Sequence, residues 1–414
     1  MSDVSLNDSV RIRPTAGTTY CLGGPDLKGD KQPAQISAET GLEVNADLSD
    51  AVKIDLNGLV QINYYRNFRQ LSLLNPQFPT LSLQDGEKPA QVQFRLPEAK
   101  LSVFGANGSL YLGYQQAVFG KTEFPLAPTN AFSGSDFSAA NQVPVYRSLP
   151  ALRADLLLGP VSVFVLAAPS SETRNIMPFQ IDRLKASVPA ATIGFINQGK
   201  ELAADGLLGL RGSWEKWGLL LTASREHDHF FRVGGGEIDP LAGAATLKGI
   251  YPVRETAAGE ISGATGNLVW WLQGNFSRYE QQPNGSISSP LGDLPLASPL
   301  YSYQGAAGLR LNFPEQYAYL SAQGFYGSLT GNGELVQSVG SARGGVQFLN
   351  GDLKFDALAN AYFESSRPKF EGFLNLTYQP VSGWEFSLGG RIAQLGIFSL
   401  AQPWYGYAGL QVKY

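Results

Sequence analysis

The sequence has 414 residues and a net charge of −4, and only 16% of its residues are charged, whereas soluble domains carry about 25%. It also holds 47 glycines, 18 tyrosines and 23 phenylalanines at a mean hydropathy of −0.10, so the apolar residues must be interleaved with polar ones. This charge gives no reason to expect a nucleic-acid partner, and no run reaches the roughly 20 apolar residues that a membrane-spanning helix needs.

The N-terminal residues do not form a recognisable signal peptide, because Met1-Ser2-Asp3 leads directly into polar sequence. We therefore expect the mature form of an exported protein with an added Met1, although a cytosolic protein would also lack a signal. Cys21 is the only cysteine, which excludes an internal disulfide.

Long stretches of strict alternation are the main signal along the chain. Apolar residues at every second position run through 52–64, 353–363 and 384–392, and polar residues dominate the positions between them. These stretches exceed the usual strand of about 5–6 residues and suit the tilted strands of about 9–11 residues that cross a membrane. We therefore expect strands with one apolar and one polar face.

Short turns alternate with long polar connections. The expected tight turns, rich in Gly, Asn, Asp and Pro, are Ser49-Asp50, Ala106-Asn107-Gly108, Gly159-Pro160, Glu215-Lys216, Thr265-Gly266-Asn267, Phe313-Pro314-Glu315, Asn350-Gly351 and Pro380-Val381-Ser382-Gly383. The long connections are residues 65–90, 120–146, 169–203, 229–251 and 280–300. Such alternation is typical of an up-and-down barrel with short periplasmic turns and long external loops.

The strand count follows from the turns. Eight hairpins, a leading strand near 10–21 and a final strand from Trp404 to Tyr414 predict about 18 strands. A further hairpin within 179–198 would give 20, and loss of the weak leading strand with one doubtful pair would give 16. The fold class we predict is therefore all-β: one transmembrane antiparallel β-barrel spanning 1–414, wide enough for an aqueous channel.

The chain end resembles the terminal signal of Gram-negative outer-membrane β-barrel proteins, which their assembly machinery reads. The residues that carry this resemblance are Gly409, Val412 and Tyr414, with apolar residues at alternate positions before the terminal aromatic. Those proteins usually end in Phe, so the terminal Tyr is a departure from the pattern. The resemblance implies insertion by the barrel assembly machinery into the outer membrane, with outer-membrane lipid and lipopolysaccharide around the barrel.

Residues 94–120 resemble the hairpin that precedes the constriction loop of Gram-negative porins. In that family the constriction loop is the third external loop and joins strands five and six, and our strand count places 120–146 in the same position. The resemblance implies a porin, of general or substrate-specific type, with 120–146 as its constriction loop. The resemblance does not decide whether the protein is a monomer or a homotrimer.

Charged residues on the polar faces are the candidate pore-lining residues, because a charge on the lipid face costs about 2–4 kcal/mol at the bilayer midplane. The basic candidates are Arg95, Arg147, Arg153, Arg211, Arg310, Arg343 and Arg391, and the acidic ones in the candidate constriction loop are Glu123 and Asp136. A basic wall opposite an acidic loop would orient dipolar solutes. The alternative is that these charges pair and fill the lumen.

Other residues are weaker candidates. The inward aromatic positions Tyr65, Tyr317, Tyr319, Phe325 and Tyr362 could guide ring-bearing solutes or simply pack the wall, and we favour packing. His227 and His229 share one side of a strand, so a metal is conceivable, but they lie at a loop edge where polar residues are expected. No motif marks a nucleophile with its base, so we expect neither catalysis nor a cofactor.

The leading hypothesis is passive diffusion of small hydrophilic solutes through a charge-lined lumen. Three alternatives remain: a barrel sheath around a partner such as an electron-transfer cytochrome, a channel for hydrophobic molecules, and a soluble all-β binding protein. The solute and the ion preference are left open.

Overall fold

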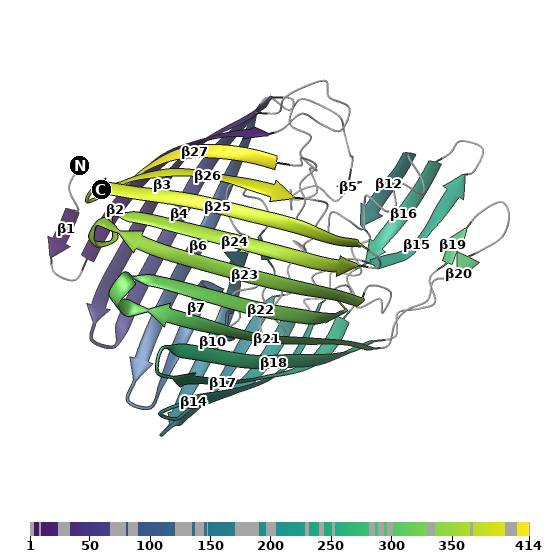
Figure 1. Cartoon of the computed structure of the whole chain (residues 1–414). Coiled ribbons are helices and arrows are strands. Elements are labelled where there is room, and N and C mark those ends of the chain that lie inside the picture. Colours follow the sequence, from purple (N-terminus) through teal and green to yellow (C-terminus); the bar gives the residue numbers. More distant parts are fainter. Residues whose placement is uncertain are drawn as a thin grey trace.

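A closed antiparallel β-barrel forms most of the molecule, which we describe from a computed structural model (Figure 1). The structure describes residues 4–7, 10–23, 34–66, 80–81, 90–120, 135–136, 145–146, 148–169, 190–195, 204–227, 232–239, 244–250, 253–280, 286–288, 294–295, 301–328, 336–364, 367–393 and 404–413. No helix among these residues is long and apolar enough to cross a membrane.

Eighteen strands close the barrel, each antiparallel to its neighbours in chain order. They are β2 (Val10–Gly23), β3 (Ala34–Ser49), β4 (Val52–Arg66), β6 (Ala90–Gly105), β7 (Gly108–Gln116), β10 (Ser148–Leu158), β11 (Val161–Pro169), β13 (Ala204–Ser213), β14 (Trp217–His227), β17 (Val253–Thr265), β18 (Leu268–Tyr279), β21 (Tyr301–Phe313), β22 (Ala318–Ser328), β23 (Val336–Phe348), β24 (Leu353–Glu364), β25 (Arg367–Val381), β26 (Trp384–Ala393) and β27 (Trp404–Lys413). The predicted fold class and strand number are confirmed.

The barrel closes where the last strand pairs with the first. β27 pairs with β2 from Thr15↔Lys413 to Gly23↔Tyr405, so the weakly alternating N-terminal stretch is a full barrel strand. The short strand β1 (Val4–Asn7) pairs with β2 at Val10–Ile12, just beyond the point where β27 ends. Both termini lie at the same end of the barrel (Figure 1). A closed ladder satisfies the backbone hydrogen bonds of every strand, as a membrane interior requires.

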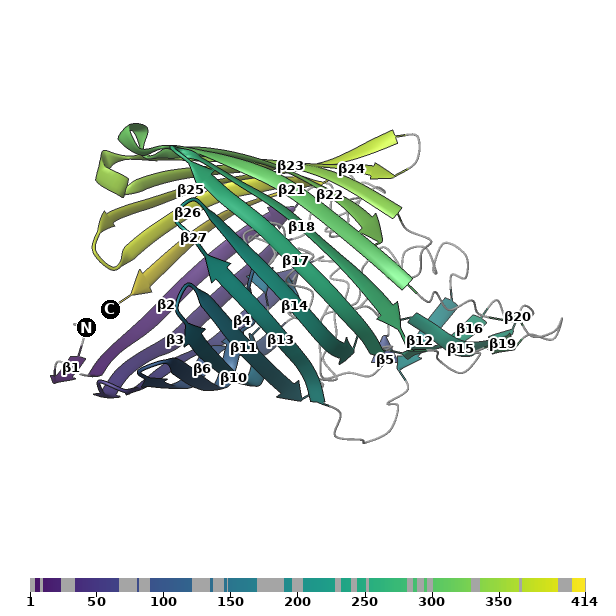
Figure 2. The ribbon, with the colours of Figure 1, turned by 90° about the horizontal axis from the view of Figure 1, so that it is seen from below.

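All eight predicted tight turns connect neighbouring strands at the end that holds the termini (Figure 2). Two of them contain single 3-10 turns, η3 (Pro314–Gln316) and η4 (Leu349–Gly351). Tyr317, which we expected to face the lumen, instead ends η3 in a left-handed conformation with 68% of its surface exposed. That expectation was wrong because the turn extends one residue further than the alternation indicated.

A second sheet gathers segments from four of the long connections at the opposite end of the barrel (Figures 1 and 2). Its strands are β5 (Thr80–Leu81), β12 (Ala190–Phe195), β15 (Arg232–Asp239), β16 (Ala244–Ile250), β19 (Ser286–Ser288) and β20 (Leu294–Pro295). β12 pairs in parallel with β16, so the hairpin proposed within 179–198 does not add strands to the barrel. The 20-strand alternative is therefore wrong.

Two further short strands, β8 (Ser135–Asp136) and β9 (Val145–Tyr146), pair with each other within the candidate constriction loop. They follow the fifth barrel strand, β7, and precede the sixth, β10, which is the position predicted for this loop.

The two faces of each strand differ in chemistry. Along β18, Trp271, Gln273 and Ser277 point inward and are buried, whereas Leu272 and Phe276 point outward with more than half of their surface exposed. Large exposed apolar side chains occupy the outer face of the other strands in the same way. Such an outer face avoids water and is the surface that lipid chains cover.

Candidate functional site

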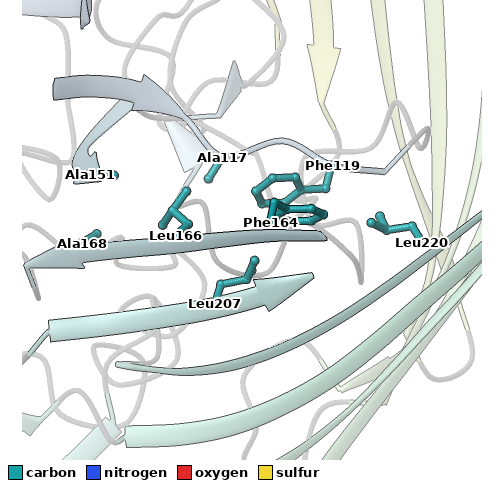
Figure 3. Packing of buried hydrophobic residues seen from close by; sticks show 8 residues of the cluster. All are labelled: Ala117, Phe119, Ala151, Phe164, Leu166, Ala168, Leu207 and Leu220. Atoms are coloured by element: carbon teal, nitrogen blue, oxygen red, sulfur yellow. The ribbon is translucent and has the colours of Figure 1, made fainter. Parts of the chain in front are cut away.

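The inner wall at β10, β11, β13 and β14 carries a buried apolar cluster. Its members are Ala117, Phe119, Ala151, Phe164, Leu166, Ala168, Leu207 and Leu220 (Figure 3). Six belong to barrel strands, but Ala117 and Phe119 belong to the segment that follows β7. That segment, residues 117–120, is called the loop root below.

The loop root turns inward and runs along the inner side of the barrel wall. Phe119 stacks on Phe164 of β11, with ring centroids 4.7 Å apart and an interplanar angle of 22° (Figure 3). Its carbonyl oxygen accepts a hydrogen bond of 3.4 Å from Nη2 of Arg211 on β13. Because β10 lies between β7 and β11, the chain has crossed β10 on the inner side of the barrel by the time it reaches Phe119. The candidate constriction loop therefore begins inside the lumen.

Arg153 lies in the centre of this wall. Its guanidinium group binds Asp155 with two hydrogen bonds, Nε to Oδ1 at 2.8 Å and Nη2 to Oδ2 at 2.7 Å. Its Cζ atom lies 5.4–5.5 Å from the ring centroids of Tyr111, Phe119 and Phe164. A guanidinium held by a carboxylate and aromatic rings is fixed in orientation. Alternation predicts an inward Arg153 but does not show that its acidic partner, Asp155, is two residues away on the same strand.

A second group of charges lies on β21–β24. The Cζ atom of Arg310 is 4.1 Å from the ring centroid of Tyr319, and that of Arg343 is 5.9 Å from it. The Tyr319 hydroxyl donates a 2.8 Å hydrogen bond to Asp356, whose Oδ1 lies 3.8 Å from Nη2 of Arg343. Arg310 also donates to Oδ1 of Asn312 at 3.0 Å. Two predicted arginines thus share one aromatic ring, which fits the predicted inward position of Tyr319.

Carboxylates held by amide side chains line the wall around the β2–β27 closure. Gln411 donates to Glu39 at 3.3 Å, Asn45 to Glu43 at 3.0 Å and Gln379 to Glu385 at 2.7 Å. An amide partner does not neutralise a carboxylate, so these groups add negative charge to the wall, and Arg13 stands opposite Glu43 in the β2–β3 ladder. These carboxylates were not among the predicted site residues, although each stands at a polar position of an alternating strand.

Buried pairs tie the β13–β17 wall together near the loop end. Glu226 and Arg254 bind across β14 and β17 at 3.0 Å, with side chains 1% and 7% exposed. His227, one of the two weak metal candidates, has its Nδ1 2.8 Å from Oδ1 of Asp205. No group of three or more metal-ligating residues occurs in the part of the chain that the structure describes, and His229 lies outside it.

The remaining predicted site residues are only partly described. Arg95 pairs with Leu59 in the ladder of β4 and β6, and Arg391 pairs with Phe373 in that of β25 and β26; the side chains of both arginines lie outside the described part. Asp136 pairs with Val145, again without a described side chain. Glu123, Arg147 and Tyr414 lie outside the described residues altogether. Gly409 and Val412 lie in β27, opposite Thr19 and Ala16 of β2.

No protein-family model matches the sequence, and no curated protein matches it. Solved structures resemble the fold over nearly the whole chain. Acinetobacter baumannii OccAB1 is 8% identical with a TM-score of 0.54, covering 100% of this chain and 98% of its own. Pseudomonas aeruginosa OccK2 (OpdF), solved in complex with glucuronate, is 9% identical with a TM-score of 0.54, covering 98% of this chain and 97% of its own.

Pseudomonas aeruginosa OpdK, solved with vanillate, is 9% identical with a TM-score of 0.51, covering 97% of this chain and 98% of its own. Because the identities are so low, these likenesses establish the barrel fold of this chain and nothing beyond it.

Proposed function

We propose that this chain is an outer-membrane porin of Gram-negative bacteria that lets small hydrophilic solutes diffuse through a charged, water-filled lumen. The observation that carries the proposal is the contrast between the two faces of a closed 18-stranded barrel: exposed apolar side chains outside, ion pairs and amides inside. A barrel of this width is large enough for an aqueous channel. The barrel assembly machinery, implied by the C-terminal resemblance, would insert it.

The charged inner wall argues against the alternative functions. A sheath around a partner protein or a channel for hydrophobic molecules would favour a smooth or apolar inner wall. Here Arg153, Asp155 and Glu226 project inward, together with the carboxylates of Glu39, Glu43 and Glu385. A polar lumen suits hydrophilic solutes, because polar wall groups can replace part of the hydration that such a solute loses.

The proposed constriction is residues 120–146, supported by the position of the loop root inside the lumen. Arg211 is the exposed basic residue beside that root, so it would meet solutes that pass the narrow zone. Glucuronate and vanillate, bound in two barrels of similar fold, are both small carboxylates. A solute of that class would pair with Arg211 and then with Arg310 and Arg343.

Planar lipid bilayers provide the test. Purified protein should insert as discrete conductance steps and release small sugars and carboxylates from liposomes, while excluding large dextrans. A protein that folds into bilayers yet neither conducts ions nor releases small solutes would contradict the porin proposal and favour the sheath. Cross-linking in membranes would show whether it forms a homotrimer.

A further inference from the structure

The outer face of the barrel is almost free of charge. Among outward strand positions with described side chains, and the residue that follows β18, charge occurs only at Arg225 of β14, Glu255 of β17, Arg278 of β18 and Glu280. The first three lie on consecutive barrel strands, and Glu280 directly follows the last of these strands. Their inward neighbours, such as Glu226 and Ser277, are buried to 1% exposure, so the assignment of faces is clear.

These residues form one row across the sheet, here called the outer charge row. Arg225 pairs with Glu255 in the β14–β17 ladder, and Glu255 pairs with Arg278 in the β17–β18 ladder. Arg225 also forms an ion pair of 2.5 Å with Glu280, with side chains 65% and 44% exposed. Arg278 is exposed and forms no ion pair with any residue that the structure describes. The row therefore keeps charge available at the surface.

The row lies where the apolar band ends. On β18 the outward positions run from Leu268 at the turn to Arg278 near the loop end. Ten residues at about 3.3 Å each, tilted by about 40°, rise about 25 Å, which is the height of the apolar band of such barrels. Beside the row, Phe276 stacks on Tyr301 at 5.4 Å, as the aromatic girdle of a membrane interface would. The row is therefore at the level of the outer lipid headgroups.

We propose that the outer charge row binds the phosphate groups of lipopolysaccharide in the outer leaflet. This proposal rests on the outer-membrane location given above. A planar guanidinium binds phosphate with two parallel hydrogen bonds. Although Glu255 faces Arg278 in the β17–β18 ladder, Arg278 forms no ion pair among the described residues, so its guanidinium can bind a phosphate. Glu255 and Glu280 suit the divalent cations that accompany such phosphates, since carboxylates are their preferred ligands. A mixed row is therefore complementary to phosphates together with their counterions.

The test measures binding of bisphosphorylated lipid A to the detergent-solubilised full chain by native mass spectrometry, in the presence of Mg²⁺. Each basic residue near an anionic lipid surface contributes about a fivefold gain in affinity, so Arg278→Gln should weaken binding about fivefold and Arg225→Gln/Arg278→Gln further. Arg278→Lys should retain more of the affinity than Arg278→Gln. Lipid A without its phosphates should bind equally weakly to all variants.

Lys216→Gln is the matched control, because it removes one positive charge from the turn of the β13–β14 hairpin at the opposite end. It should leave lipid A binding unchanged. Equal binding by the double variant and the native protein would overturn the proposal, as would an equal loss from Lys216→Gln. A double variant that binds lipid A normally but no longer forms oligomers would instead assign the row to a contact between copies.

Single-channel conductance separates this proposal from the porin proposal. The row faces away from the lumen, so the double variant should conduct like the native protein. A conducting barrel that binds no lipid A would refute only the lipid site, whereas a barrel that binds lipid A without conducting would refute only the porin.

Discussion

Glycines on the inner wall provide space for aromatic side chains on neighbouring strands. Four such pairs are directly opposed in the ladders: Gly209 with Phe164, Gly308 with Trp271, Gly345 with Tyr319, and Gly389 with Tyr407. In each, a methyl group added to the glycine would lie between 2.0 and 2.5 Å from an atom of the ring. An aromatic ring that covers a glycine fixes the register of the two strands. Part of the high glycine content therefore serves packing inside the barrel.

Gly209→Ala should destabilise the barrel, because the new methyl group would lie 2.0 Å from Cζ of Phe164 and displace the ring from its stack with Phe119. Overpacking of this kind costs about 1–3 kcal/mol. Urea titration of folding into lipid vesicles would measure it. Gly206→Ala, in the same strand with nothing within 4 Å of the added atom, should have little effect, and an equal loss in both variants would contradict the packing argument.

Asp155→Asn should shift ion selectivity toward anions. It keeps the shape of the side chain but leaves the Arg153 charge uncompensated in the lumen. A unit charge about 4 Å from a hydrated ion changes its energy by about 1 kcal/mol, so the permeability ratio should change by up to about fivefold. Reversal potentials in a salt gradient would show it. Arg153→Met should shift selectivity in the opposite direction, and shifts of the same sign would contradict the assignment of both residues to the lumen.

The barrel strands and their turns could be predicted from sequence because period-two alternation is a local property of the chain. Charge is costly on the apolar band of the outer face, so the alternation within a strand indicates which face points outward, and 52–64 in β4 shows it almost without exception. The strand β12 was mistaken for part of a hairpin because its partner, β16, lies about 50 residues further along the chain. Alternation carries no information about which distant strand pairs with which.

Site residues were predictable only as inward positions. Arg153, Arg211, Arg310 and Arg343 follow the alternation of their strands, but the sequence did not reveal which side chains they contact. Phe119 was missed because it follows a strand rather than lying within one, and nothing local shows that the chain turns inward there. Contacts across several strands depend on the closed barrel as a whole.

Shortening the segment 121–145 should raise single-channel conductance markedly. Its root lies inside the lumen, held by the Phe119–Phe164 stack and the hydrogen bond from Arg211, so the segment departs from the inner wall. Shortening 281–299 by the same number of residues should leave conductance unchanged, because that connection contributes β19 and β20 to the sheet beyond the barrel. Equal effects of the two deletions would place the constriction elsewhere, with 169–203 the next candidate.

Closure of the barrel depends on its two terminal strands, which are the most distant in the sequence. β27 pairs with β26 on one side and with β2 on the other, and β1 continues the edge of β2 beyond Lys413. Until β27 and β2 meet, each exposes an unpaired edge, which is a site of aggregation. Both the assembly and the stability of the barrel therefore depend on the C-terminal strand, because it closes the sheet.

Deleting Tyr414 should reduce the amount of assembled barrel without changing the channel. The β2–β27 ladder runs from Thr15↔Lys413 to Gly23↔Tyr405 and does not include the terminal residue, so its loss removes none of those pairs. If the assembly machinery reads the terminal aromatic, less barrel should reach the outer membrane, measured as the heat-modifiable folded form in membrane fractions. The same variant, refolded from urea into detergent, should conduct like the native protein.

Tyr414→Phe keeps the aromatic ring and should assemble normally. Native amounts of the deletion variant in the outer membrane would show that the terminal residue is not a signal, and a refolded variant with altered conductance would assign it a role in the channel itself.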